Sequence, residues 1–202
     1  MAFNIKEYPK KYFKKKSTFG IVSDFVFIVL IVLLINPGTR TELSAFFIKL
    51  TSFPPSTLDA EEQVMLGASS ANWQLTDKAG RKVTFKELGQ KPVFLNIWAT
   101  WCPPCVAEMP GIAELQSEFG EHVNFVMVTN EAKGLVDAFI EKHNYQDLNI
   151  YFSGRLPPDF ETQSIPATYI IDKNGKIVVS KKGAARWNSS KIKNLLNSLI
   201  KE

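Results

Sequence analysis

Cysteine and histidine are scarce in this sequence, which has two residues of each type among 202. Two cysteines are too few for a disulfide-stapled scaffold or for a four-cysteine structural zinc site. An excess of one charge is also lacking, since 24 basic side chains stand against 20 acidic ones. Apolar residues make up 45% and charged residues 22%, which excludes collagen-like, wholly disordered and multi-span membrane proteins. The length fits one globular domain with an additional segment.

The small net charge of +4 is concentrated at the N-terminus. Residues 1–17 contain six lysines and one glutamate, so the rest of the chain carries 18 basic and 19 acidic groups. The calculated pI near 9.0 therefore comes from this tail. No basic surface is predicted elsewhere, and we expect no nucleic acid among the partners.

An apolar run over 19–35 follows the lysines, and its length is close to the lower limit for a transmembrane helix. Asp24 is the one charged residue in the run and lies near its start, where a charge costs less than at the bilayer centre. Asn36, Pro37 and Gly38 would end the helix. The alternatives are a buried core helix and a cleaved signal peptide, but no small-x-small cleavage site follows the run. We therefore favour an uncleaved anchor with the lysines in the cytoplasm, by the positive-inside rule.

This pattern divides the chain into four segments. We expect a basic cytoplasmic tail at 1–18, a transmembrane anchor at 19–36, a linker at 37–66 and a globular domain at 67–202. Residues 43–50 of the linker are apolar and are expected either at the membrane surface or packed on the domain. The globular domain would lie on the outer side of the membrane.

Hydrophobic patterning predicts alternating strands and helices in the domain. Gly80 and Gly175 each lie in a turn between apolar runs and indicate hairpins. Thr84 and Glu87 form a capping-box pattern that predicts a short helix. Between the hairpins we expect strands at 93–98, 123–128 and 148–152, and helices at 103–119 and 131–143. The order hairpin, β-α-β-α-β, then β-β-α indicates an α/β sandwich with a mixed sheet.

Both cysteines lie in the segment Trp101-Cys102-Pro103-Pro104-Cys105, where the strand at 93–98 leads into the helix at 103–119. A helix N-terminus favours a thiolate over a thiol, and the spacing puts the two sulfurs about one turn apart. Cys102, nearer the exposed end, is predicted to be the attacking thiol and Cys105 the resolving thiol in disulfide exchange. Pro103 suits the first helical turn, although the two prolines also remove two N–H groups that could stabilise the thiolate.

Three other interpretations of the cysteine pair fit the sequence less well. A structural disulfide closing so short a loop would add little stability. A metal site would need further ligands, and His122 and His143 lack the spacing of metal ligands, so no metal is expected. We expect both histidines, and also Trp73 and Trp187, to be packing or surface residues. Two buried, inert thiols fit poorly at a strand-to-helix junction beside Trp101. C-x-x-C next to a β-α-β pattern is typical of a thioredoxin-like redox motif, and no cofactor is expected beyond the redox-active pair itself.

The segment Asn96–Pro110 resembles the active-site segment of the membrane-anchored TlpA/ResA-like thioredoxin family. Ser164–Thr168 resembles the cis-proline loop of that superfamily, Lys173–Ile177 its closing hairpin, and Trp73–Leu88 its N-terminal hairpin extension. The resemblance covers about residues 64–202. It implies a thioredoxin-like α/β sandwich with a mixed central sheet and an N-terminal β-hairpin extension, preceded by one transmembrane helix.

The resemblance also implies roles for single residues. Pro166 would follow a cis peptide bond, and the backbone of Ile165 would pair with a bound client. Glu108 matches the acidic residue that the family places behind the cysteines, where burial and a raised pKa would let it take the proton of the resolving thiol. The alternative is a solvated helix glutamate. Asn96 stands where thioredoxins proper carry a buried aspartate, which leaves Glu108 as the nearby acid.

Client binding is expected around the cysteines and the cis-proline loop. The predicted binding residues are Trp101, Pro103, Pro104, Ile165 and Pro166, and we expect Trp98 and Trp101 to shape the rim of the site.

The function implied by the resemblance is that of a thiol-disulfide oxidoreductase, in particular a reductase acting outside a bacterial inner membrane. Its partners would be client proteins with disulfides, apocytochrome c among the candidates, and a transmembrane thiol-carrying electron donor. The alternatives are a disulfide-forming oxidase or isomerase, and a non-catalytic peptide-binding or chaperone module. A peroxidase of related fold is less expected, because peroxidatic cysteines occur in a different local pattern.

Overall fold

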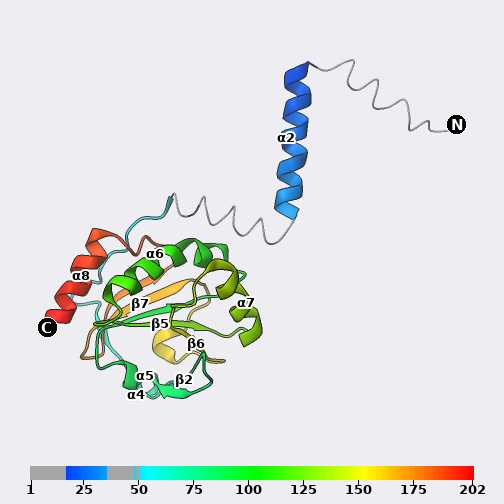
Figure 1. Ribbon diagram of the computed structural model, residues 1–202. Coiled ribbons are helices and arrows are strands. Elements are labelled where there is room, and N and C mark those ends of the chain that lie inside the picture. The colour runs from blue at the N-terminus through cyan, green and yellow to red at the C-terminus, as the bar shows by residue number, and fades with distance from the viewer. Residues whose placement is uncertain (1–16, 36–47, 49–50) are drawn as a thin grey trace. The chain divides into compact units, whose positions relative to one another are not determined.

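The structure is a computed structural model that describes residues 17–35, 48 and 51–202 (Figure 1). The chain divides into two compact units, residues 1–40 and 41–202. The first contains helix α2, Thr18–Ile35, which coincides with the predicted anchor. A search of the described residues finds no helix that combines the length and the apolarity needed to cross a membrane. The transmembrane anchor is therefore not confirmed and stays a prediction, and the lysine tail lies outside the described residues.

The second unit contains one eight-stranded sheet, in the order β1-β8-β7-β4-β5-β6-β2-β3. The strands are β1 (Val64–Met65), β2 (Gln74–Asp77), β3 (Lys82–Thr84), β4 (Val93–Ile97), β5 (Asn124–Thr129), β6 (Ile150–Phe152), β7 (Ala167–Ile171) and β8 (Lys176–Lys182). The helices are α4 (Ala68–Ala71), α5 (Phe85–Leu88), α6 (Pro103–Phe119), α7 (Lys133–His143), the 3₁₀ helix η1 (Pro158–Phe160) and α8 (Ser190–Lys201).

Strand direction in the centre of this sheet is mixed. β4, β5 and β6 run parallel to one another, whereas β7 and β8 pair antiparallel next to β4. The parallel pairs are joined by α6 and α7, because a parallel connection must cross over one face of the sheet. The predicted α/β sandwich with a mixed sheet is confirmed.

The two faces of the sheet are covered by different helices. Phe94 of β4 packs in one buried cluster with residues of α6, α7 and α8, while Val93, Leu95 and Ile97 belong to a second cluster with residues near α5 and η1. Successive side chains of a strand point to opposite faces, so this alternation is expected. In Figure 1, α6 and α8 lie on one side of the sheet and α4 and α5 on the other. Asn96 shares the face of Phe94 and therefore points toward α6.

Both predicted hairpins are present. β2 and β3 pair antiparallel around Gly80, and β7 and β8 around Gly175, with both glycines at positive φ near +85° (83° and 86°). Residues other than glycine rarely adopt that conformation, which explains the glycine in each turn. The Thr84–Glu87 capping box is also formed at the start of α5.

Some boundaries and short elements differ from the predictions. α7 begins at Lys133 rather than at residue 131, and β6 at Ile150 rather than 148. β1 lies inside the predicted linker and pairs with β8, and neither β1 nor the short helices α4 and η1 were anticipated. Elements of two to four residues are too short to produce a hydrophobic period, so patterning cannot reveal them. Of the apolar stretch at 43–50, only Ile48 belongs to the described residues.

Candidate active site

The C-x-x-C pair lies where the buried strand β4 leads into α6. Cys102 is the N-cap of α6 in an extended conformation, Pro103 occupies the first helical position, and the N–H of Cys105 donates to the Cys102 sulfur at 3.3 Å. Pro103 and Pro104 have no N–H, so the Cys105 N–H is the first that α6 offers to that sulfur. The two N–H groups that the prolines remove are therefore absent as expected, and one backbone donor of the first turn remains aimed at Cys102.

The two sulfurs are joined in a disulfide, with 5.3 Å between the Cα atoms. Cys102 is 3% exposed and Cys105 is fully buried, so Cys102 is the more accessible of the two by a narrow margin. The neighbouring Trp101 is 67% exposed. In this oxidised state the disulfide itself is almost inaccessible to solvent, and the exposed group beside it is the side chain of Trp101.

The peptide bond between Ile165 and Pro166 is cis, as predicted. The loop comes back to the cysteines, and the Ile165 carbonyl oxygen lies 3.7 Å from the Cys102 sulfur. A disulfide sulfur has no proton to donate, so these two atoms are close neighbours and do not form a hydrogen bond. The loop is held from behind by the Gly183 N–H, which donates to the Pro166 carbonyl at 2.8 Å.

Glu108 lies on α6 one turn after Cys105, and it is 4% exposed. The Asn96 amide donates to Oε1 at 2.7 Å, while the Trp187 indole N–H at 2.9 Å and the Ala185 N–H at 3.2 Å donate to Oε2. Burial raises the pKa of Glu108 to about 7, although all three hydrogen bonds favour the carboxylate and oppose that rise. Glu108 is buried, as the resemblance implied, and is not a solvated helix glutamate.

Trp187 and Thr168 are parts of this environment that the sequence interpretation missed. Trp187 does pack, with its ring edge-on to Phe94 at 5.0 Å, but it also donates to the buried carboxylate. Thr168 accepts the second N–H of the Asn96 amide at 2.8 Å, which fixes the orientation of that amide. Asn96 and Thr168 lie opposite each other in the β4–β7 register, so the strand alternation was the available signal.

A second carboxylate holds the segment just before the cysteines. Glu131 accepts from the Thr100 N–H at 2.6 Å and from its hydroxyl at 2.7 Å. The loop after β5 is thereby tied to the loop that carries Cys102. We refer to this pair as the Thr100–Glu131 clasp. No sequence signal marked Glu131, because its partner lies 31 residues away and joins it only in the fold.

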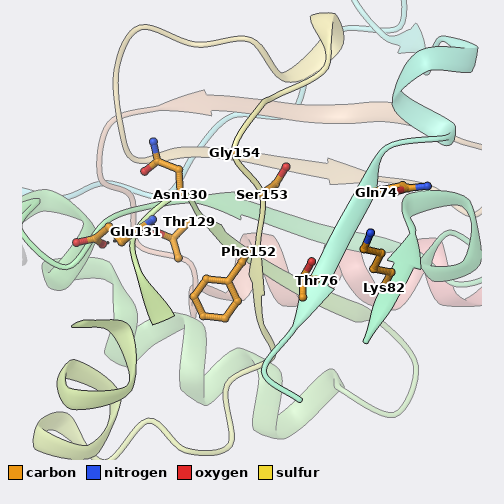
Figure 2. Close-up of a pocket in the computed structure, with 9 residues that line it drawn as sticks. All are labelled: Gln74, Thr76, Lys82, Thr129, Asn130, Glu131, Phe152, Ser153 and Gly154. Carbon is orange, nitrogen blue, oxygen red and sulfur yellow. Dashed lines mark hydrogen bonds between the residues drawn. The ribbon is translucent and has the colours of Figure 1, made fainter. Parts of the chain in front are cut away.

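A groove of about 270 Å³ begins at the rim of the cysteine site. Trp101, Trp98 and Ile165 line it at one end, and Thr129, Asn130, Ser153 and Gly154 continue it. The last four residues also line a second hollow of about 320 Å³, which reaches Thr76 and Lys82 of the N-terminal hairpin (Figure 2). The groove and this hollow therefore form one continuous surface leading from Trp101 to the hairpin.

The structure brings most of the predicted site residues together. Cys102, Ile165 and Trp101 meet at the rim, Pro166 is buried behind it, and Pro103 and Pro104 form the half-buried first turn of α6. Trp98 lines the groove with a ring that is almost entirely buried, so it supports the rim from beneath.

Within the described residues, no group of three His, Cys, Asp or Glu side chains is placed to hold a metal ion. His122 is exposed, and the ring of His143 packs against Phe139 with 4.4 Å between centroids.

Comparison with known proteins identifies this arrangement. The family model described as Redoxin matches residues 65–198. The chain belongs to the Redoxin family and is of the TlpA/ResA-like thioredoxin type. A curated relative in this family is the thiol-disulfide oxidoreductase ResA of Bacillus thuringiensis subsp. konkukian, with 32% identity over 126 residues, covering 61% of this chain and 73% of the relative. ResA of Bacillus subtilis is 31% identical over 121 residues, covering 58% and 68%.

A solved structure shows the same fold. StoA from Bacillus subtilis aligns with a TM-score of 0.52 at 22% identity, over 67% of this chain and all of StoA (100%). This Redoxin-family protein is a thiol-disulfide oxidoreductase with a CxxC-spaced cysteine pair, as its relatives are.

Proposed function

We propose that this oxidoreductase is a membrane-tethered reductase of client disulfides that acts outside a bacterial inner membrane. The reductase activity in this proposal rests mainly on the buried Glu108 carboxyl, one helical turn beyond Cys105. A base in that place suits the resolving step, in which a reduced client is released.

The first step is attack by Cys102. In the reduced protein its thiolate would be stabilised by the N-terminus of α6 and by the Cys105 N–H that points at the sulfur. The thiolate forms a bond to one sulfur of the client disulfide, and the other client sulfur leaves as a thiolate. The product is a mixed disulfide between Cys102 and the client.

The second step is resolution by Cys105. Its thiol transfers a proton to the Glu108 carboxylate, and the resulting thiolate attacks the Cys102 sulfur. The Cys102–Cys105 disulfide forms, and the second client sulfur leaves as a thiolate, so two electrons pass from the protein to the client. A pKa of about 7 keeps Glu108 able both to accept and to release a proton near neutral pH.

Client recognition in this proposal uses the rim and the groove. Trp101 is exposed beside Cys102 and offers an apolar contact, while Ile165 lies next to the sulfur with its backbone available to an extended client segment. Pro103, Pro104 and Pro166 shape the two loops that present these groups.

The tether is proposed on the basis of the N-terminal unit. α2 exposes large apolar side chains such as Phe19, Phe25 and Phe27, and a lysine-rich tail precedes it in the sequence. Exposed apolar surface of this kind requires a partner or a membrane. With the tail in the cytoplasm, the oxidoreductase domain would lie outside, where a transmembrane thiol-carrying protein would supply electrons and apocytochrome c is a candidate client.

The direction of electron flow is tested by equilibrating the full chain with defined ratios of reduced and oxidised glutathione. A reductase is expected to have a potential nearer the about −270 mV of thioredoxin than the about −120 mV of a strong periplasmic oxidant. A potential at the oxidising end would assign the protein to disulfide formation or isomerisation instead.

A companion measurement separates catalysis from simple binding. Cys102→Ser should abolish insulin disulfide reduction, because no attacking thiolate remains. A variant that keeps full reductase activity would refute the proposed mechanism, and a wild-type protein that binds unfolded peptides without reducing insulin would be a non-catalytic binding module.

A further inference from the structure

A small cavity reaches Glu108 and shares no lining residue with the groove. It has a volume of about 40 Å³ and is lined by Glu108, Gly111 and Glu114 of α6 and by Arg186 and Asn188 of the loop between β8 and α8. Neither cysteine lines it, and Glu108 does not line the groove near Trp101. A cavity of this size has room for water, and the polar side chains in its lining could bind it. Glu108 is therefore reached by a cavity that is separate from the groove proposed for the client.

The segment Ser52–Phe53, which we call the strap, runs along this cavity. Ser52 is one of the lining residues, and Arg186 binds the strap twice, with its N–H donating to the Phe53 carbonyl at 3.1 Å and its guanidinium to the Ser52 carbonyl at 3.2 Å. The Ser52 hydroxyl donates to the Ile48 carbonyl at 2.7 Å, and Ile48 packs against α6 at Ala107. The strap is thus attached both to the mouth of the cavity and to the helix that carries Glu108.

We propose that Glu108 exchanges its proton with solvent through this cavity, with Arg186 and Glu114 as positioning residues at its mouth and the strap controlling its opening. This inference rests on the proposed role of Glu108 in resolution.

The need for such a route follows from the chemistry of the site. When Cys105 resolves the mixed disulfide, its proton passes to Glu108 while the client still covers the rim. Both cysteines are buried and neither lines the cavity, so the cavity offers the proton a route to solvent apart from the rim that the client covers. The proton would pass from Glu108 to water in the cavity and then to bulk solvent, and no other bond would form or break.

The groups that face Glu108 permit this transfer. The groups that donate to the carboxyl, from Asn96, Ala185 and Trp187, carry no charge. The other charged groups at the cavity are Arg186 and Glu114. Glu114 is itself engaged, because its Oε2 accepts from Asn188.

Gly111→Ala offers a way to fill the cavity without disturbing the fold. An added Cβ would meet Asn188 atoms at 3.5–3.7 Å, which is ordinary contact, and alanine is a better helix former than glycine. The matched control is Gly134→Ala on α7, where a Cβ meets nothing within 4 Å. Arg186→Gln removes the guanidinium contact to the strap and should loosen it.

The experiment follows the indole N–H of Trp187 by ¹⁵N NMR in the full-length oxidised chain through a pH titration. This N–H donates to Glu108, so its chemical shift reports the protonation of the carboxyl, and its line shape reports how fast that protonation exchanges. The indole N–H of Trp73, which donates to Ser153 and Arg155 in the other cluster, is the internal control.

In the wild type and in Gly134→Ala we expect one averaged Trp187 signal that moves with pH. In Gly111→Ala we expect the exchange to slow by about tenfold or more, with a broadened or split signal, because exchange must wait for local opening. Arg186→Gln should speed it. Equal exchange in all four proteins would overturn the cavity route alone. A Trp187 signal that never titrates would show that Glu108 does not change protonation, and would overturn both its role in resolution and this inference.

Discussion

At Glu108, burial and hydrogen bonding act in opposite directions on one carboxyl group. Three donors stabilise its charged form, yet removal from water outweighs them and holds the pKa at about 7 instead of the ordinary 4.5. The folded protein therefore binds a proton here between about pH 4.5 and 7 that the unfolded chain has already released. Such a group lowers the stability of the fold as the pH rises through that window.

We predict that Glu108→Gln removes this pH dependence. From pH 5 to pH 8 the wild-type free energy of unfolding should fall by about 2.5 kcal/mol relative to the variant, because each pH unit between 5 and 7 contributes up to roughly 1.4 kcal/mol. Urea denaturation of both oxidised proteins at a series of pH values measures this difference. Parallel curves for the two proteins would show that Glu108 titrates in the fold as it does in the unfolded chain.

At the scale of elements, the active site depends on three segments that meet at the N-terminus of α6. β4 delivers Asn96 and the strand end, the cis-proline loop delivers Ile165, and the loop after β5 delivers Glu131. The clasp ties the residues directly before Cys102 to another element through a side chain with two hydrogen bonds. The clasp should therefore set the rigidity of the loop that presents the attacking sulfur.

Loss of the clasp is predicted to loosen this loop. Glu131→Ala removes both acceptors of Thr100 and should lower stability by about 1–3 kcal/mol, since a half-buried N–H and hydroxyl lose their partners. Hydrogen exchange of a peptide covering 98–102 should speed, while peptides of α8 remain unchanged. Glu121→Ala, at an exposed glutamate, is the control. Protection of the Thr100 amide equal to that of the wild type would mean that the clasp contributes nothing.

The long, strongly patterned elements were predictable from the sequence. β4 and α6 have the length and apolar periodicity that decide an element's type, and the turn glycines Gly80 and Gly175 marked both hairpins. The C-x-x-C motif at their junction was also predictable, because its residues are adjacent in the sequence. Glu131 and Trp187 were not, because their roles depend on partners 31 and 79 residues away, which no local pattern encodes.

At the scale of the whole molecule, the two units have different physical characters. The domain buries most of its apolar side chains in two clusters, one on each face of the sheet, whereas α2 exposes phenylalanine and branched aliphatic side chains between Phe19 and Ile31. Burial of that surface in lipid would explain why the lysine-rich tail precedes it.

Charges placed on α2 are predicted to release the protein from membranes. Phe27→Asp combined with Leu30→Arg should shift the full chain from the membrane fraction to the soluble fraction, because a charge within a bilayer costs about 2.5–3.5 kcal/mol. Leu135→Lys, at a residue 63% exposed on α7, is the matched control and should leave the distribution unchanged. A wild-type chain that is already soluble would contradict the proposed tether.

Cys102 attacks and Cys105 resolves in the proposed mechanism, and trapping with oxidised glutathione tests these two roles most directly. Reduced Cys105→Ser should form a stable mixed disulfide at Cys102, detected by mass spectrometry of the intact protein, because no resolving thiol is present. Reduced Cys102→Ser should form little, since Cys105 is fully buried. A mixed disulfide that accumulates on Cys105 and not on Cys102 would contradict the account.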